Sequence, residues 1–122
     1  MHELSIVSSV VDSVTEALTA YPGARVQAVH LRIGTLQSVI VESLEFCWGI
    51  ATEDTPLAGS RLAVKMLPVV AHCAACGATA ELASLQSFTC PQCHAPVTDL
   101  RQGRELEVDS IEIEEPQEAL RS

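Results

Sequence analysis

The chain has 122 residues, of which 48% are hydrophobic and 3% aromatic, and seven Lys and Arg stand against sixteen Asp and Glu for a formal net charge of −9. This length supports one ordinary domain with at most a small second module, and the composition predicts an aliphatic core. The negative charge disfavours nucleic acid and anionic membrane surfaces as partners, and so few aromatic side chains offer no platform for stacking bases.

The first third of the chain predicts a helix followed by a strand. Apolar side chains recur at helical spacing over residues 4–21, and Pro22 and Gly23 end this helix. The following residues alternate apolar and polar side chains, which predicts a half-buried strand ending at Gly34. Its apolar side chains are Val29, Leu31 and Ile33, and its polar ones are His30 and Arg32.

Helical spacing returns from Val41 to about Glu53. Cys47 falls on the apolar face of this second helix, and we interpret it as a buried thiol that acts as a small hydrophobic residue. Its nearest charged neighbours, Glu42 and Glu45, disfavour a reactive thiolate. We therefore do not expect Cys47 to be a metal ligand.

The second half of the chain predicts two strands separated by a cysteine-containing insert. Residues 61–70 have the pattern of a strand that leads into the insert, and a polar link ending at Gly103 follows it. The last strand, over 104–115, changes its apolar phase near Asp109 or Ser110, where a bulge would restore the pattern. We interpret its acidic residues as a solvated face, with docking of a partner as the alternative.

This order of elements predicts an α+β fold, in which two helices cover one face of a three-stranded sheet and a small zinc-ribbon module is inserted before the last strand. The main domain is expected over residues 1–70 plus 104–118, and the insert over 71–103. No apolar run approaches the roughly 20 residues that cross a bilayer, and nothing resembles a secretion signal. We therefore expect a soluble cytoplasmic protein with reduced thiols.

The insert contains two C-x-x-C pairs, Cys73 with Cys76 and Cys90 with Cys93, separated by thirteen residues. Two thiolates three positions apart on a tight turn can bind one ion, and two such turns complete a tetrahedron. Four cysteine ligands leave no position for water. We therefore expect a structural zinc site that folds the insert, rather than a catalytic one.

Gly77, His72 and His94 flank these pairs. Gly77 and His94 occupy equivalent places after the two pairs, and both residue types accept the left-handed turn expected there. Residues 90–94 also fit the C-x-x-C-H pattern of haem attachment, but this would leave the first pair without a role, and a redox pair lacks its usual strand-helix-strand context. We interpret His72 and His94 as neighbours of the zinc site, with an exchange of ligands as the alternative.

The chain begins with Met1, His2 and Glu3. A free α-amine, the His2 amide nitrogen and the His2 imidazole can close fused five- and six-membered chelate rings around one ion, and Glu3 can add its amide or its carboxylate. Such a nitrogen-rich set suits Ni(II) or Cu(II) rather than zinc or magnesium. The alternative is an ordinary helix start, in which Glu3 complements the positive end of the helix dipole.

Five motifs occur in order along the chain: MHELS at the start, R-I-G at 32–34, C-A-A-C-G at 73–77, C-P-Q-C at 90–93 and G-R-E-L at 103–106. Together they resemble the HypA family, the nickel-insertion proteins of hydrogenase and urease maturation. The resemblance implies that the first domain binds nickel. It implies nickel ligands at Met1, His2 and Glu3 and structural zinc ligands at Cys73, Cys76, Cys90 and Cys93.

The resemblance also implies a function. We expect a nickel metallochaperone, not an enzyme, that delivers Ni(II) for maturation of nickel-iron hydrogenase and, in some organisms, of urease. A surface site with open edges can surrender its ion by ligand exchange. The implied partners are a nickel-delivery GTPase, the hydrogenase large subunit and urease accessory proteins. The alternative is a zinc-ribbon adaptor that transfers no metal.

Overall fold

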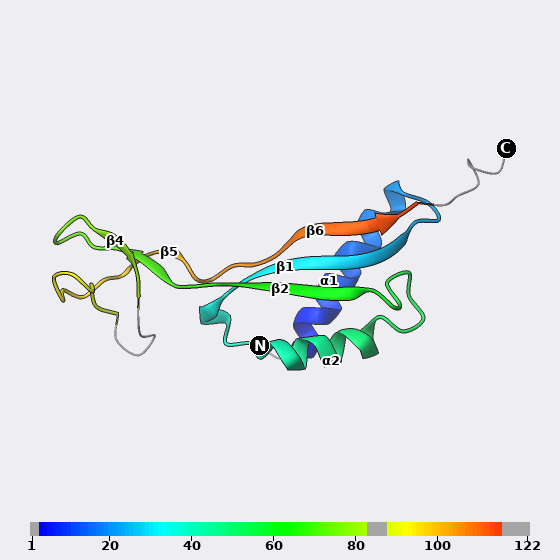
Figure 1. Cartoon of the computed structure of the whole chain (residues 1–122), viewed down its shortest axis with the longest axis horizontal. Helices are drawn as coiled ribbons and strands as arrows, with labels where there is room; N and C mark the ends of the chain where they lie inside the picture. The colour runs from blue at the N-terminus through cyan, green and yellow to red at the C-terminus, as the bar shows by residue number, and fades with distance from the viewer. Residues whose placement is uncertain (1–2, 83–87, 116–122) are drawn as a thin grey trace. The chain divides into compact units, whose positions relative to one another are not determined.

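The computed structural model describes residues 3–82 and 88–115 of the chain (Figure 1). In this part of the chain, six strands form two three-stranded sheets, with strand orders β2-β1-β6 and β4-β3-β5. The helical elements are α1 (Glu3–Ala17), η1 (Leu18–Ala20), η2 (Thr35–Gln37) and α2 (Val41–Ala51). The strands are β1 (Arg25–Gly34), β2 (Arg61–Leu67), β3 (Val70–His72), β4 (Thr79–Glu81), β5 (Asp99–Gln102) and β6 (Leu106–Glu114).

The chain divides into two compact units. The first, called here the helical unit, comprises Met1–Leu31, Val39–Val64 and Val108–Ser122. The second, the cysteine unit, comprises Arg32–Ser38 and Lys65–Glu107. The division of function between residues 1–70 plus 104–118 and residues 71–103 stays a prediction.

In the helical unit, α1 and α2 lie on the same face of the sheet, as predicted (Figure 1). β1 is the central strand of this sheet, with β2 on one side and β6 on the other. The predicted alternation holds: the apolar side chains of β1 are buried, whereas His30 and Arg32 are half-buried on the other face. The helices add the buried side chains Ile6, Val7, Val10, Val11 and Val14 of α1 and Leu44 and Trp48 of α2.

The predicted change of phase in β6 is present. Its half-buried residues are Val108, Ile111 and Ile113, and both residues between the first two, Asp109 and Ser110, are exposed. The acidic residues on the open face of the sheet lie against basic ones. Glu112 contacts His30 and lies 3.7 Å from the Arg61 guanidinium. These contacts agree with a solvated face on this strand.

The second half of the chain differs from the prediction at two places. Residues 61–70, expected as one strand, form β2 and β3 in separate sheets, because Pro68 has no N–H with which to continue the ladder. Residues 99–102, expected as a polar link, form β5 instead. β3 pairs antiparallel with both β4 and β5, placing His72 opposite Thr79 on one side and Asp99 on the other.

The core of the cysteine unit is small and contains two of the predicted metal ligands. Its buried members are Val69, Ala71, Cys73, Leu82, Cys90 and Val97. Four aliphatic side chains are few for a stable core, so the two cysteines matter to packing as well as to chemistry. Among the described helices of the whole chain, none is long and apolar enough to span a membrane.

Candidate metal centres

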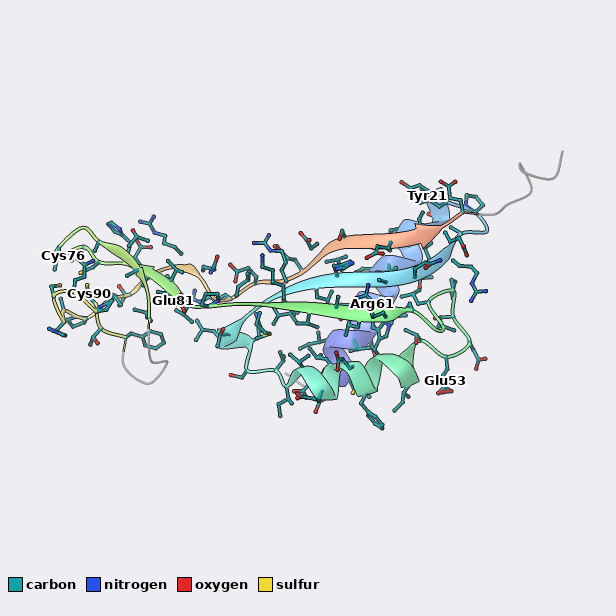
Figure 2. All side chains as sticks on the ribbon, viewed as in Figure 1. Tyr21, Glu53, Arg61, Cys76, Glu81 and Cys90 are labelled. Carbon is teal, nitrogen blue, oxygen red and sulfur yellow. The ribbon has the colours of Figure 1, made fainter. Side chains whose placement is uncertain are left out.

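The four predicted zinc ligands meet in space. Their Sγ atoms all lie within 4.8 Å of one another. The separation is 3.5 Å between Cys73 and Cys93 and 3.7 Å between Cys76 and Cys90. Zinc with four sulfurs at about 2.3 Å would set them about 3.8 Å apart, whereas a disulfide needs about 2.05 Å. The cluster therefore has the size of a tetrahedral zinc site, and Figure 2 shows Cys76 and Cys90 on adjoining loops.

Each cysteine pair lies on its own backbone turn, and the two turns are of the same type. In the first, the Cys73 carbonyl accepts the Gly77 N–H at 2.7 Å; in the second, the Cys90 carbonyl accepts the His94 N–H at 2.8 Å. The residues that close the turns are left-handed, with φ of 78° at Gly77 and 64° at His94. This confirms the predicted turn geometry. In each turn, the backbone bond brings the two cysteines of the pair to the same side of the turn, where both sulfurs can reach one ion.

A second pair of bonds joins each turn to the chain that follows it. The Cys73 N–H donates to the Ala78 carbonyl at 2.7 Å, and the Cys90 N–H donates to the Ala95 carbonyl at 2.8 Å. Cys73 and Cys90, the first cysteines of the pairs, are buried, whereas Cys76 and Cys93 are exposed. One side of the cluster thus faces the core and the other faces solvent.

The thiols of the cluster compete for protons. Backbone hydrogen bonds from Cys93 and Gln92 lower the pKa of the Cys90 thiol to about 6. At Cys76 a hydrogen bond from Ala78 lowers the pKa, but the bond with Cys90, partial burial and the other thiols outweigh it and raise the pKa to about 12. Four thiolates this close need a cation to offset their repulsion, and a divalent soft-ligand metal supplies one.

Neither flanking histidine belongs to the cluster. Among the described residues, the ligand atoms that could hold one ion are those of the four cysteines. The His72 Nδ1 instead lies 2.8 Å from the Thr79 Oγ1, across the strand pair β3 and β4. The structure thus gives His72 a hydrogen-bonding role beside the site.

The predicted nickel ligands are described only in part, since Met1 and His2 lie outside the described residues. Glu3 is the first residue of α1, and its Oε2 accepts the backbone N–H of Ile40 at 3.1 Å. A pocket of about 420 Å³ opens beside it. The pocket is lined by Glu3 and Leu4 of α1 and by Glu42, Ser43, Phe46 and Cys47 of α2.

Ile40 was not among the residues predicted for this site. Its contribution is a backbone N–H at the start of α2, which side-chain chemistry does not mark. The available signal was indirect: the predicted second helix begins at Val41, and the residue before it, Ile40, has no side chain that could cap a helix. Cys47, interpreted as buried, is half-buried and lines the pocket.

Comparison with known proteins identifies the family of this chain. A family model described as "Hydrogenase/urease nickel incorporation, metallochaperone, hypA" matches residues 1–113. The chain belongs to the HypA family. This confirms the resemblance and assigns the chain to a family of nickel metallochaperones in hydrogenase maturation.

Curated relatives and solved structures agree with this assignment. The hydrogenase maturation factor HypA of Chloroflexus aurantiacus is 42% identical over 112 residues, covering 92% of this chain and 98% of the relative. The hydrogenase maturation factor HypA of Desulfosudis oleivorans is 40% identical over 116 residues, which cover 94% of this chain and 100% of the relative. The solution structure of the Ni metallochaperone HypA from Helicobacter pylori is similar to this structure with a TM-score of 0.66 and 22% sequence identity. The match covers 95% of this chain and 100% of that one, so the two proteins share the same fold.

Proposed function

We propose that this chain is a nickel metallochaperone that binds one Ni(II) through the Met1 amine, His2 and Glu3 and delivers it for hydrogenase maturation. The match of the HypA family model over residues 1–113, which includes this terminus and all four cysteines, carries the proposal. Delivery to urease is part of the same proposal, because the family description names both enzymes.

The chemistry of the terminus suits a transported ion. Amine, amide and imidazole nitrogens form fused chelate rings that favour Ni(II) over zinc or magnesium. A site built from the first residues of a chain can leave the edges of the ion open, so ligands of a recipient can enter before those of the chaperone leave. Affinity of the order of micromolar fits this task, since a much tighter site would retain the ion.

We propose zinc at the cysteine cluster, where it serves structure. The sulfur separations of 3.5 and 3.7 Å support it, as does the small core around Cys73 and Cys90. When bound, zinc cross-links the two turns and neutralises their thiolates. The ligands are Cys73, Cys76, Cys90 and Cys93, and the zinc-binding domain extends over residues 71–103, with the nickel-binding domain over 1–70 plus 104–118.

The proposal extends to the cellular setting. The chain acts in the cytoplasm as a carrier without catalytic activity. Its partners are a nickel-delivery GTPase, the hydrogenase large subunit and urease accessory proteins. Membership of a maturation family supports such partners, since a metallochaperone works by contact with its recipient pathway.

Nickel titration of the zinc-loaded, tag-free chain tests the central proposal. We expect calorimetry to find one Ni(II) per chain with an authentic Met1. His2→Ala, or one extra residue before Met1, should weaken binding at least tenfold, because either change breaks the chelate rings. His30→Ala is the matched control, since His30 lies on the sheet and contacts Glu112. Unchanged affinity in both altered termini would leave only the zinc-ribbon adaptor.

A further inference from the structure

Within residues 3–82 and 88–115, the outer edge of β6 is open. In the strand order β2-β1-β6, this strand pairs with β1 on one side and ends the sheet on the other (Figure 1). A strand at the edge of a sheet presents unpaired N–H and C=O groups on its free side, and another extended segment can pair with them. β6 is nine residues long, whereas the edge strand β4 of the other sheet has three. It therefore offers the longer free edge of the two.

An apolar groove of about 280 Å³ lies beside this edge. Its lining includes Ala17 at the end of α1, Leu18 and Tyr21 in and after η1, and Ile111 and Ile113 of β6. Tyr21 is 49% exposed and lies beside the end of β6 (Figure 2), and the two isoleucines are only half-buried. The helices thus leave part of the apolar side of β6 uncovered, next to the free edge.

The whole net charge of the chain belongs to the helical unit. Counted along the sequence, this unit contains twelve of the sixteen Asp and Glu residues and three of the seven Lys and Arg residues, whereas the cysteine unit contains four of each kind. On β6, Glu112 contacts His30, but Asp109 and Glu114 are exposed and form no ion pair with any described residue. A segment beside this strand therefore meets negative charge that the protein itself does not offset.

The two faces of β6 favour different side chains in such a segment. Neighbouring strands place their side chains next to each other on the same face of a sheet. Every second side chain of the segment would enter the groove beside Ile111 and Ile113, where apolar side chains fit. The others would lie on the open face beside Glu112 and Glu114, where Lys or Arg fit. A second copy of β6 fits poorly, because it would bring Glu against Glu.

We propose that the edge of β6 and its groove bind an extended segment of a partner protein in which apolar residues alternate with Lys or Arg. The segment adds a fourth strand to the sheet of the helical unit. Docking of a partner, the alternative interpretation of the acidic residues in this strand, is then the role of those that make no ion pair. The proposal does not depend on nickel, since the groove lies at the last residue of α1, whereas Glu3 is the first.

Peptide binding to the full, zinc-loaded chain tests the proposal. The probe is a fluorescent peptide of about eight residues, an ordinary strand length, that alternates Val and Lys. We expect anisotropy to show binding at least about tenfold tighter than for the same residues in two blocks, which keep the charge without the alternation. A peptide that alternates Val and Glu should bind at least about tenfold more weakly as well.

Filling the groove should block the probe. Ala17→Trp places a large side chain in the groove and should weaken binding at least about tenfold. The matched control is Ala58→Trp, at an exposed alanine before β2 on the other edge of the sheet, which should leave binding unchanged. Circular dichroism checks the fold of both variants, and Ala17→Lys provides a second test if Ala17→Trp does not fold. Unchanged binding in the folded Ala17 variants overturns the proposal.

A pair of charge variants separates local complementarity from general attraction. Asp109→Asn with Glu114→Gln should weaken binding about fivefold, as for the loss of two exposed ion pairs. Glu42→Gln with Glu45→Gln removes two exposed charges from α2 and should change affinity less than about twofold. Equal weakening by the two pairs, or equal binding of the alternating and block peptides, overturns the proposal. A dimer in sedimentation of the peptide-free chain that Ala17→Trp dissociates overturns it too, because a second copy would then occupy the groove.

Discussion

Gly34 and Gly103 lie in backbone contact, although they are far apart in the chain. A Cβ atom built on Gly34 would stand 2.0 Å from the carbonyl carbon of Gly103 and 2.5 Å from the Arg104 nitrogen. The contact is held by the Leu36 N–H, which donates to the Gly103 carbonyl at 2.9 Å. Gly34 has an ordinary φ of −74°, so it is the close approach of backbone that requires glycine here.

Gly34→Ala should therefore destabilise the protein severely. The added methyl meets backbone rather than a movable side chain, and we expect a loss of about 3 kcal/mol or more. Thermal unfolding followed by circular dichroism measures it. Gly49→Ala is the control, because a Cβ at this exposed position of α2 meets nothing within 4 Å. Gly49→Ala should stabilise the helix by up to about 1 kcal/mol. If both variants lose the same amount of stability, the close contact at Gly34 is not the cause of the loss.

The glycine contact illustrates what sequence patterns convey. Both glycines belong to motifs that indicated the family, yet no local pattern predicts that residues 34 and 103 touch. The cysteine cluster was predictable because spacing alone brings each pair onto one turn, and Gly77 and His94 marked the turn type. The helices and the alternation in β1 followed from periodicity in the same way.

The features missed by the sequence were short or distant. β3 and β5 have three and four residues, too few for an alternation to be recognised, and Pro68 divided a pattern that looked continuous. The contact between Glu3 and Ile40 was missed because a carboxylate that caps a different helix leaves no local signature. The sequence thus predicted the cysteine cluster, and the structure added the backbone bonds that shape it.

Removal of zinc should unfold the cysteine unit in particular. Its core has few aliphatic side chains, and zinc binding can contribute roughly 10 kcal/mol of apparent free energy. After chelation we expect loss of hydrogen-exchange protection at the amides of Cys73, Gly77, Cys90 and His94, all bonded within the two turns. The Leu44 amide of α2 should stay protected. Hydrogen exchange followed by mass spectrometry measures both regions.

Cysteine variants provide the matched comparison. Cys90→Ser should reproduce the effect of chelation and lower the zinc content below one ion per chain, since Cys90 is a buried member of the cluster. Cys47→Ser changes a cysteine of α2 outside the cluster and should leave zinc bound. Equal zinc loss in the two variants would argue against the cluster as the binding site.

Trp48 offers a reporter for the helical unit, as it is the single tryptophan of the chain. Its side chain is 3% exposed, and its Nε1–H donates to the Ser60 Oγ at 3.0 Å. Ser60→Ala leaves this buried donor without its acceptor and should cost about 1 to 2 kcal/mol. Denaturation followed by Trp48 fluorescence measures the loss. Ser9→Ala, at an exposed position of α1, should leave stability unchanged or slightly higher. If Ser9→Ala loses as much stability as Ser60→Ala, the hydrogen bond to Trp48 does not explain the loss.

Glu112 should make the stability of the helical unit depend on pH in the acid range. The hydrogen bond with His30 lowers the pKa of this carboxyl, and the charges of His30 and Arg61 lower it further. A carboxyl whose pKa is depressed by folding stabilises the folded state above its unfolded pKa of about 4.3. This contribution is lost as the pH falls through the lower folded value. The advantage of the unmodified chain over Glu112→Gln should therefore shrink below about pH 4.3.

A carboxyl titration by NMR tests the cause directly. In His30→Ala the midpoint of Glu112 should rise toward its ordinary value, because both the hydrogen bond and the nearest charge are gone. Arg32→Ala is the control: it removes a cation from the same strand, but one whose guanidinium pairs with Glu107 at 2.9 Å. If the Glu112 midpoint moves equally in both variants, the general charge of the sheet face lowers the pKa, and the specific contact with His30 does not.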